Sequence, residues 1–257
     1  VCPVMRSAAV SSDEALDLRV YASWRDSVCA WCMKLADSTN VQAKHTLQCA
    51  HCATARWCSE ACAQSHREHG DHGVACEFLS TASPQLLQDD DAAAVLNVAC
   101  GTLALRAKSQ DKLERLVLAQ STEVALSASE RRAAAAVADL LHRYAAAFED
   151  AAPARSELGT LFTRAILSVA KEAELQQHEQ PDEDEDDDDD DAPAIETTGG
   201  RSLAWWLRQM IRREKSNSFG HHMPADVTPP AKGSGIYPLL AAMNHSCTPN
   251  VRGSLVL

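Results

Sequence analysis

Four pairs of metal-binding side chains stand in one short stretch of the sequence: CAWC at 29–32, CAHC at 49–52, CSEAC at 58–62 and HGVAC at 72–76. Seven of the chain's ten cysteines lie in this stretch. A two-residue gap lets a tight turn direct two thiolates at one ion, and a three-residue gap places two ligands at i and i+4 on one helix face. Four pairs predict two closed, tetrahedral zinc sites.

The predicted zinc ligands combine seven thiols with one imidazole: Cys29, Cys32, Cys49, Cys52, Cys58, Cys62, His72 and Cys76. His69 is the alternative to His72, because it lies seven residues before Cys76 and could share its helix face. The i, i+4 geometry favours His72. The other histidines of the stretch are interpreted as surface residues or as supports of the ligands: His45, His51 and His66.

Zinc explains how this stretch can fold, since it has few large apolar side chains and needs a substitute for a hydrophobic core. The alternative is a secreted domain held together by disulfides, which an even number of cysteines allows. No basic and then apolar signal segment supports that alternative. A CxxC pair is also a poor structural disulfide and a good metal chelate, so zinc is favoured.

Composition and charge restrict the class of protein to which this chain can belong. The chain has 257 residues, 46% of them hydrophobic, and a formal charge of −12. Residues 182–191 are ten consecutive acids, so the rest carries −12 + 10 = −2. A nearly neutral remainder argues against a nucleic-acid binder, and no apolar stretch approaches a membrane span. We expect an intracellular protein, and the ends at Val1 and Leu257 suggest a fragment.

The middle of the chain predicts four amphipathic helices. Ser83 and Pro84 suit an N-cap and first turn, and a helix is expected over about 90–107. Ser127 and Glu130 form a possible capping box before a helix that Pro153 ends. Apolar spacing marks two more helices, one around Leu158, Phe162, Ile166 and Val169, the other around Leu203, Trp206, Leu207, Met210 and Ile211. Three aromatics are assigned to the core, although they could instead line a groove: Tyr144, Trp205 and Trp206.

An acidic segment, 180–200, separates the last two helices. Adjacent like charges repel one another and bury nothing, so a disordered loop is predicted. A docking site for basic partners such as histone tails or ribosomal proteins is the more specific alternative. From the residues alone, the later NHSCTPN at 244–250 describes only a polar turn after a short apolar segment, in which the asparagines could simply cap turns.

The order of these motifs resembles a known family. The cysteine and histidine pattern is similar to the MYND zinc finger, although Trp57 stands where that module often has tyrosine and His69 where it often has tryptophan. NHSCTPN resembles the signature of SET-domain lysine methyltransferases. GIYP at 235–238 and NSF at 217–219 are similar to further segments of the SET and MYND domain (SMYD) family. The resemblance covers 29–76 and 217–250 closely and the helices loosely.

The resemblance implies an α+β fold in which a cross-braced two-zinc finger and a mostly helical insert interrupt a β-rich SET domain. One zinc would take Cys29, Cys32, Cys58 and Cys62, and the other Cys49, Cys52, His72 and Cys76. The implied segments are the end of a split N-terminal SET part (1–28), the finger (29–76), the helical insert (77–179), the acidic loop (180–200), and a helix with a partial SET core (201–257).

The resemblance also implies a function, protein-lysine N-methylation with S-adenosylmethionine as the methyl donor. Asn217, Asn244 and His245 would contact that cofactor, and Cys247 would be one ligand of a third zinc ion. No catalytic residue is assigned, because the glycine-rich cofactor segment, the strand with the catalytic tyrosine and the CxC cluster of the family are missing. Tyr237 belongs to the GIYP segment. This chain by itself is therefore expected to be inactive.

The competing function is a non-catalytic adaptor whose finger binds proline-containing peptides of transcriptional regulators. Either function places the protein in the nucleus and cytoplasm, with protein partners and with no direct contact to nucleic acid or membrane. A DNA-binding zinc protein would suit the finger, but no dense face of lysine and arginine is visible.

Overall fold

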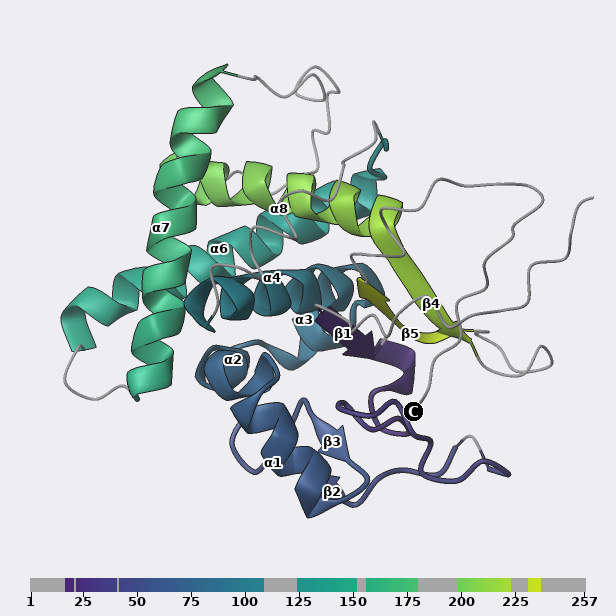
Figure 1. Ribbon diagram of the computed structural model, residues 1–257. Helices are drawn as coiled ribbons and strands as arrows, with labels where there is room; N and C mark the ends of the chain where they lie inside the picture. The colour runs from purple at the N-terminus through teal and green to yellow at the C-terminus, as the bar shows by residue number, and fades with distance from the viewer. Residues whose placement is uncertain are drawn as a thin grey trace, which may run out of the picture.

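The computed structural model describes residues 17–20, 22–40, 42–108, 124–151, 156–179, 198–222 and 231–236. Within these residues the fold is α+β, with seven α-helices and two small antiparallel sheets (Figure 1). None of the described helices combines the length and the apolarity needed to cross a bilayer. The predicted disorder of the acidic segment concerns residues 180–197, which lie outside the described residues.

The larger sheet joins segments from both ends of the described chain. Strand β1 (Asp17–Val20) and strand β4 (Ser218–His222) both pair antiparallel with strand β5 (Ala231–Ile236), which gives the order β1-β5-β4. Asp17 lies opposite Ile236, and Ser218 faces the same residue from the other side. Everything between β1 and β4 is therefore an insertion between neighbouring parts of one sheet (Figure 1).

The first part of this insertion holds the predicted metal ligands. After the short helix η1 (Ala22–Trp24) come strands β2 (Leu47–Gln48) and β3 (Arg56–Trp57), which pair antiparallel, and then helices α1 (Glu60–Glu68) and α2 (His72–Leu79). The hydroxyl of Ser59 caps α1 by accepting a hydrogen bond from the backbone N–H of Cys62. These elements contain the finger, residues 29–76.

The four predicted helices are confirmed as α4 (Asp90–Lys108), α6 (Ala128–Ala151), α7 (Glu157–Glu179) and α8 (Thr198–Asn217). Ser83 and Pro84 open a separate short helix, α3 (Pro84–Gln88), because Asp89 is extended and its carboxylate caps α4. The Ser127 and Glu130 capping box is present, with hydrogen bonds of 3.2 Å and 2.8 Å between each side chain and the other residue's N–H.

One hydrophobic core runs from the finger into the helices. Phe78 and Leu79 at the end of α2 are buried, and Phe78 stacks against Tyr144 of α6 and Phe162 of α7. Tyr144 and Trp205 are buried and Trp206 is half-buried against the same core, which confirms the core assignment of these aromatics.

Two of the expected segment boundaries lie inside helices. The boundary at 76/77 cuts α2, which carries His72 and Cys76 in its first turns and core residues in its last. The acidic loop was expected to reach Gly200, but α8 begins at Thr198 and Gly200 is buried. In both places a continuous helix crosses the expected boundary.

Candidate metal centre

The first cluster consists of four thiols drawn from the first and third ligand pairs. The Sγ atoms of Cys29, Cys32, Cys58 and Cys62 all lie within 4.8 Å of one another. The Cys58 sulfur lies 3.6 Å from that of Cys32 and 3.5 Å from that of Cys62. Cys29 is fully buried, whereas Cys58 is exposed, so the cluster lies at the surface with one side open.

The second cluster draws on the remaining two pairs. The Sγ atoms of Cys49, Cys52 and Cys76 and a ring nitrogen of His72 also lie within 4.8 Å of one another. The Cys49 and Cys76 sulfurs are 3.6 Å apart, and His72 Nε2 lies 3.9 Å from the Cys52 sulfur. The pairs therefore alternate along the chain between the two clusters, which is the grouping that the resemblance implies.

Both clusters fit tetrahedral zinc. Zn–S bonds of about 2.3 Å place the sulfur ligands of a tetrahedral ion about 3.8 Å apart, close to the separations found here. A disulfide would require a sulfur separation of about 2.05 Å, and the eight described cysteines are free thiols. With four ligands each, the Cys₄ and Cys₃His sets leave no open position and are suited to structural metal binding rather than catalysis.

The two CxxC turns share one backbone feature. Met33 and Ala53, each directly after the second cysteine of its pair, have positive φ angles of 60° and 57°. Their N–H groups donate to the carbonyls of Cys29 and Cys49, at 3.0 Å and 3.1 Å, and these hydrogen bonds close the two turns. A left-handed conformation costs a residue other than glycine about 1–2 kcal/mol.

Glycine should therefore act oppositely at these two positions. Ala53→Gly relieves backbone strain at an exposed residue and should raise the free energy of unfolding by about 1 kcal/mol. Met33→Gly relieves the same strain but deletes a fully buried side chain. This substitution should therefore lower the free energy of unfolding by about 2 kcal/mol. Urea unfolding of the zinc-loaded chain measures both, and changes of equal sign would contradict this account.

In each cluster, hydrogen bonds lower the pKa of one buried thiol and so favour thiolate, the form that binds zinc. In the second, a hydrogen bond from the Cys76 thiol, supported by His72 and Thr54, lowers the pKa of Cys52 to about 2 against the effect of burial. In the first, burial raises the pKa of Cys29, but the backbone N–H groups of Cys32, Cys58 and Trp31 outweigh it and lower the pKa overall.

His66 connects the two clusters. Trp57 Nε1, which can only donate, lies 3.1 Å from His66 Nδ1, and His66 Nε2 lies 2.8 Å from an Asp71 oxygen. Nδ1 must then accept, so Nε2 carries the proton and donates to Asp71. Burial raises the pKa of Asp71, but this hydrogen bond lowers it to about 2. Because Trp57 precedes Cys58 and Asp71 precedes His72, this triad links one ligand of each cluster.

Ring packing strengthens the same connection. The centre of the His66 ring lies 5.2 Å from that of His72 and 5.8 Å from that of Trp31. In the sequence, Trp31 stands within the CxxC pair of the first cluster. Trp57 packs edge-on against His72 at 5.3 Å and is buried. The triad and these rings therefore restrict the position of the His72 imidazole.

Trp57→Phe should weaken zinc binding. The substitution keeps an aromatic ring but removes the N–H donor, which leaves a buried acceptor on His66 unpaired at a cost of about 1–3 kcal/mol. Competition with a chromophoric chelator should show about a tenfold loss of affinity for the weaker ion. His69→Gln, on the exposed side of the α1 terminus, is the control and should leave the affinity unchanged. Equal affinities in both variants would show that the triad does not support the ligands.

The other histidines have separate places. His69 is exposed beside Glu68 and belongs to neither cluster. His51 Nδ1 lies 3.7 Å from the Cys76 sulfur, outside the four-ligand set. His45 is buried, and its Nε2 lies 3.0 Å from the carbonyl of Lys34, in the turn that follows Cys32.

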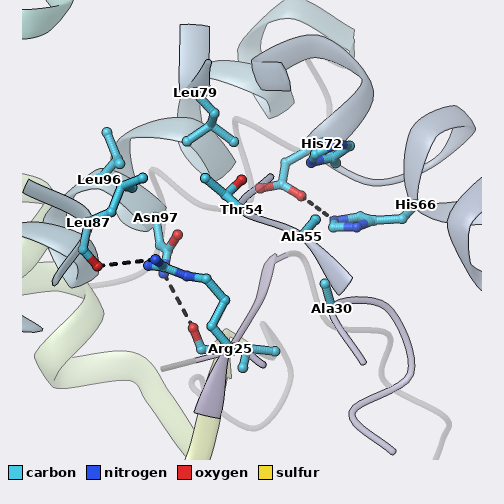
Figure 2. A pocket seen from close by; sticks show the side chains of 12 residues that line it. Arg25, Ala30, Thr54, Ala55, His66, His72, Leu79, Leu87, Leu96 and Asn97 are labelled. Carbon is cyan, nitrogen blue, oxygen red and sulfur yellow. Dashed lines mark hydrogen bonds and ion pairs between the residues drawn. The ribbon is translucent and has the colours of Figure 1, made fainter. Parts of the chain in front are cut away.

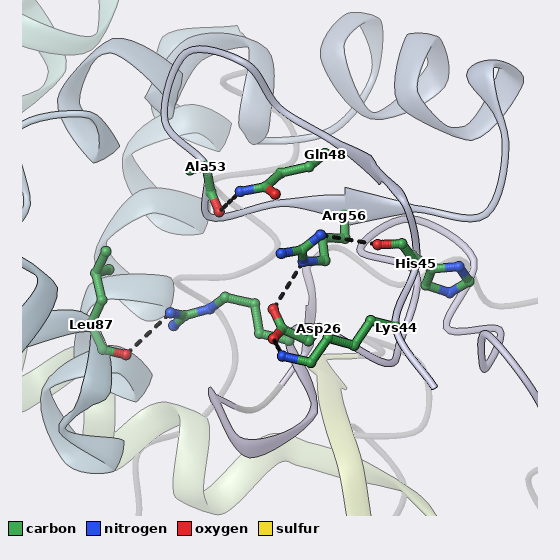
Figure 3. A network of polar contacts seen from close by, with 8 residues as sticks. Asp26, Lys44, His45, Gln48, Ala53, Arg56 and Leu87 are labelled. Carbon is green, nitrogen blue, oxygen red and sulfur yellow. Dashed lines mark hydrogen bonds and ion pairs between the residues drawn. The ribbon is translucent and has the colours of Figure 1, made fainter. Parts of the chain in front are cut away.

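A polar network attaches the first CxxC turn to β3 (Figure 3). Asp26 accepts hydrogen bonds from Lys44 and, at 2.9 Å, from Arg56, and these lower its pKa. Arg56 also donates to the carbonyl of His45 at 3.0 Å. Since Arg56 and Trp57 form β3 directly before Cys58, this network positions the third ligand pair against the first.

The predicted cofactor residues are only partly described. Asn217 is the last residue of α8 and directly precedes β4. Asn244, His245 and the third-zinc residue Cys247 lie outside the described residues, as does Tyr237. No family model, curated protein or solved structure matches the chain.

Proposed function

We propose that the chain binds two structural zinc ions and belongs to a SET and MYND type protein-lysine methyltransferase. The observation that carries the proposal is the alternation of ligand pairs between the two clusters. That cross-braced grouping, with its Cys₄ and Cys₃His sets, is the one expected from the finger that the sequence resembles.

The topology of the larger sheet gives independent support. A SET domain that is split by a finger and a helical insert requires strands before and after the insertion to share one sheet. Strand β1 precedes the finger, β4 and β5 follow α8, and β1 pairs with β5 over four residue pairs. The helical insert would then serve as a platform that holds the finger against this sheet.

In this proposal, S-adenosylmethionine supplies an electrophilic methyl group to a lysine amine. Asn217, Asn244 and His245 would hold the cofactor through polar contacts. The position of Asn217, at the junction of α8 with β4 and next to the interrupted sheet, supports this proposed role. The zinc ions would take no part in the reaction, because all four positions of each are filled by protein.

The experiment uses the reading frame that contains residues 1–257, extended to its limits in both directions. Isothermal titration should detect S-adenosylmethionine binding, and a tritiated donor should label lysines of histones or other cell proteins. Asn217→Ala should reduce the affinity for the donor at least tenfold, whereas Ser216→Ala, one residue earlier, should not.

A protein that carries two zinc ions but binds no methyl donor would contradict the methyltransferase proposal and favour the adaptor. Titration with proline-containing peptides would then be the next measurement. A protein that folds without zinc would contradict both.

A further inference from the structure

A pocket lies where the finger meets β1, α3 and α4 (Figure 2). Half of its lining is apolar, namely Val20, Ala30, Ala55, Leu79, Leu87 and Leu96, and half is polar, namely Arg25, Thr54, His66, Asp71, His72 and Asn97. Two nitrogen-bearing side chains, Arg25 and Asn97, come together at one end, and His66 and His72 lie across from them (Figure 2). The pocket thus combines apolar walls with a cationic group at one end and polar side chains at the other.

Arg25 is the unusual member of this lining. One of its guanidinium nitrogens donates to the carbonyl of Leu87 at 3.1 Å, and among the described residues it has no further hydrogen bond and no ion pair. A guanidinium carries five N–H donors, so most of its donor capacity is unused. The neighbouring Asp26 is already held by Lys44 and Arg56 (Figure 3).

The charge of Arg25 persists in this setting. Burial lowers the pKa of the guanidinium from its usual range, with the negative charges of Asp26 and Asp90 acting in the opposite direction. An arginine side chain nevertheless remains protonated in proteins. A partly buried cation is stabilised by an anion that enters its pocket, and the planar guanidinium matches a carboxylate with two parallel hydrogen bonds.

The opposite end of the pocket does not compete for this cation. There the Asp71 carboxylate accepts the hydrogen bond from His66. At the Arg25 end, the Asn97 amide donates to the carbonyl of Val20 at 3.4 Å. The leucine and alanine walls between these ends suit a chain of a few methylene groups.

We propose that this pocket binds a carboxylate on a short apolar stem and that Arg25 anchors it. The carboxylate comes either from a free short-chain acid or from a glutamate side chain of a peptide, which present the same group. The pocket shares His72 with the second cluster, so its test uses the zinc-loaded chain, but its lining contains none of the proposed methyl-donor residues.

Butyrate and butyramide are the matched probes, because they share size and shape and differ in charge. Titration of the zinc-loaded, ¹⁵N-labelled chain should shift the Arg25 Nε–H resonance, with a Kd for butyrate in the millimolar range and binding of butyramide at least tenfold weaker. Equal binding of the two probes, or no shift up to solubility, would overturn the proposal.

Two variants assign the binding to this pocket. Arg25→Met should abolish butyrate binding, whereas Arg132→Met, at an exposed position on α6, should leave it intact. Ala30→Leu fills the pocket without changing its charge and should also abolish butyrate binding. Butyrate binding that survives both pocket variants would overturn the proposal. A peptide with one central glutamate that binds at least tenfold more tightly than butyrate would identify protein as the source, and weaker binding would identify a free acid.

Discussion

Cys52→Ser is expected to remove at least one of the two zinc ions and to unfold the finger. Cys52 is a buried ligand of the second cluster, held by hydrogen bonds from Cys76, His72 and Thr54. A structural zinc ion contributes about 10–16 kcal/mol to the folding of small zinc domains, whereas whole domains are stable by about 5–15 kcal/mol. Loss of one ligand therefore outweighs the packing of the finger on the helices.

Metal analysis together with a circular dichroism melt measures this effect. Cys100→Ser is the matched control, since Cys100 is also buried but lies on α4 outside both clusters. The control should keep two zinc ions and lose only about 1–2 kcal/mol of stability from its buried position. A Cys52→Ser protein with two zinc ions and an unaltered melt would refute the ligand assignment.

Gly73→Ala is expected to separate the two helices that carry ligands of different clusters. A Cβ atom on Gly73 of α2 would lie 1.9 Å from the carbonyl oxygen of Arg67, which belongs to α1. Backbone cannot rotate away as a side chain can, so α1 must move as a unit and take Cys62 with it. We expect the free energy of unfolding to fall by about 3 kcal/mol or more, although alanine is a better helix former than glycine.

Gly159→Ala is the matched control for this substitution. The added Cβ would approach the carboxylate of Glu77 to 2.3 Å, but that group is the mobile end of a side chain. Displacing the Glu77 carboxylate disturbs the 2.8 Å hydrogen bond that Ser156 donates to it. The free energy of unfolding should therefore change by less than about 1 kcal/mol. Urea unfolding and zinc content should separate the two variants, and equal losses would show that the contact between α1 and α2 is not decisive.

The zinc clusters were predictable because their ligands are paired locally. Cys29 with Cys32, and His72 with Cys76, lie within one turn or one helix, where spacing determines geometry. The capping box of Ser127 and Glu130 is local in the same way. His72 was separable from His69 because only the i, i+4 spacing to Cys76 brings both side chains to one ion.

The surroundings of the clusters depend on contacts between distant segments. Nothing in the spacing of Trp57, His66 and Asp71 indicates that they share hydrogen bonds, although His66 lies four residues after Cys62 on the same helix face. The pairing of Asp17 with Ile236 and the pocket around Arg25 likewise arise only when the insertion folds back. Such contacts are set by tertiary packing, which local patterns do not contain.

The central claim is that two zinc ions are held by seven thiolates and one imidazole in alternating pairs. Zinc K-edge absorption spectroscopy of the protein, with zinc and protein quantified in the same sample, tests it most directly. The account predicts two ions per chain, sulfur neighbours at about 2.3 Å and a minor imidazole contribution. His72→Cys should convert the spectrum to sulfur alone. One ion per chain, or a shell dominated by oxygen and nitrogen, would contradict the account.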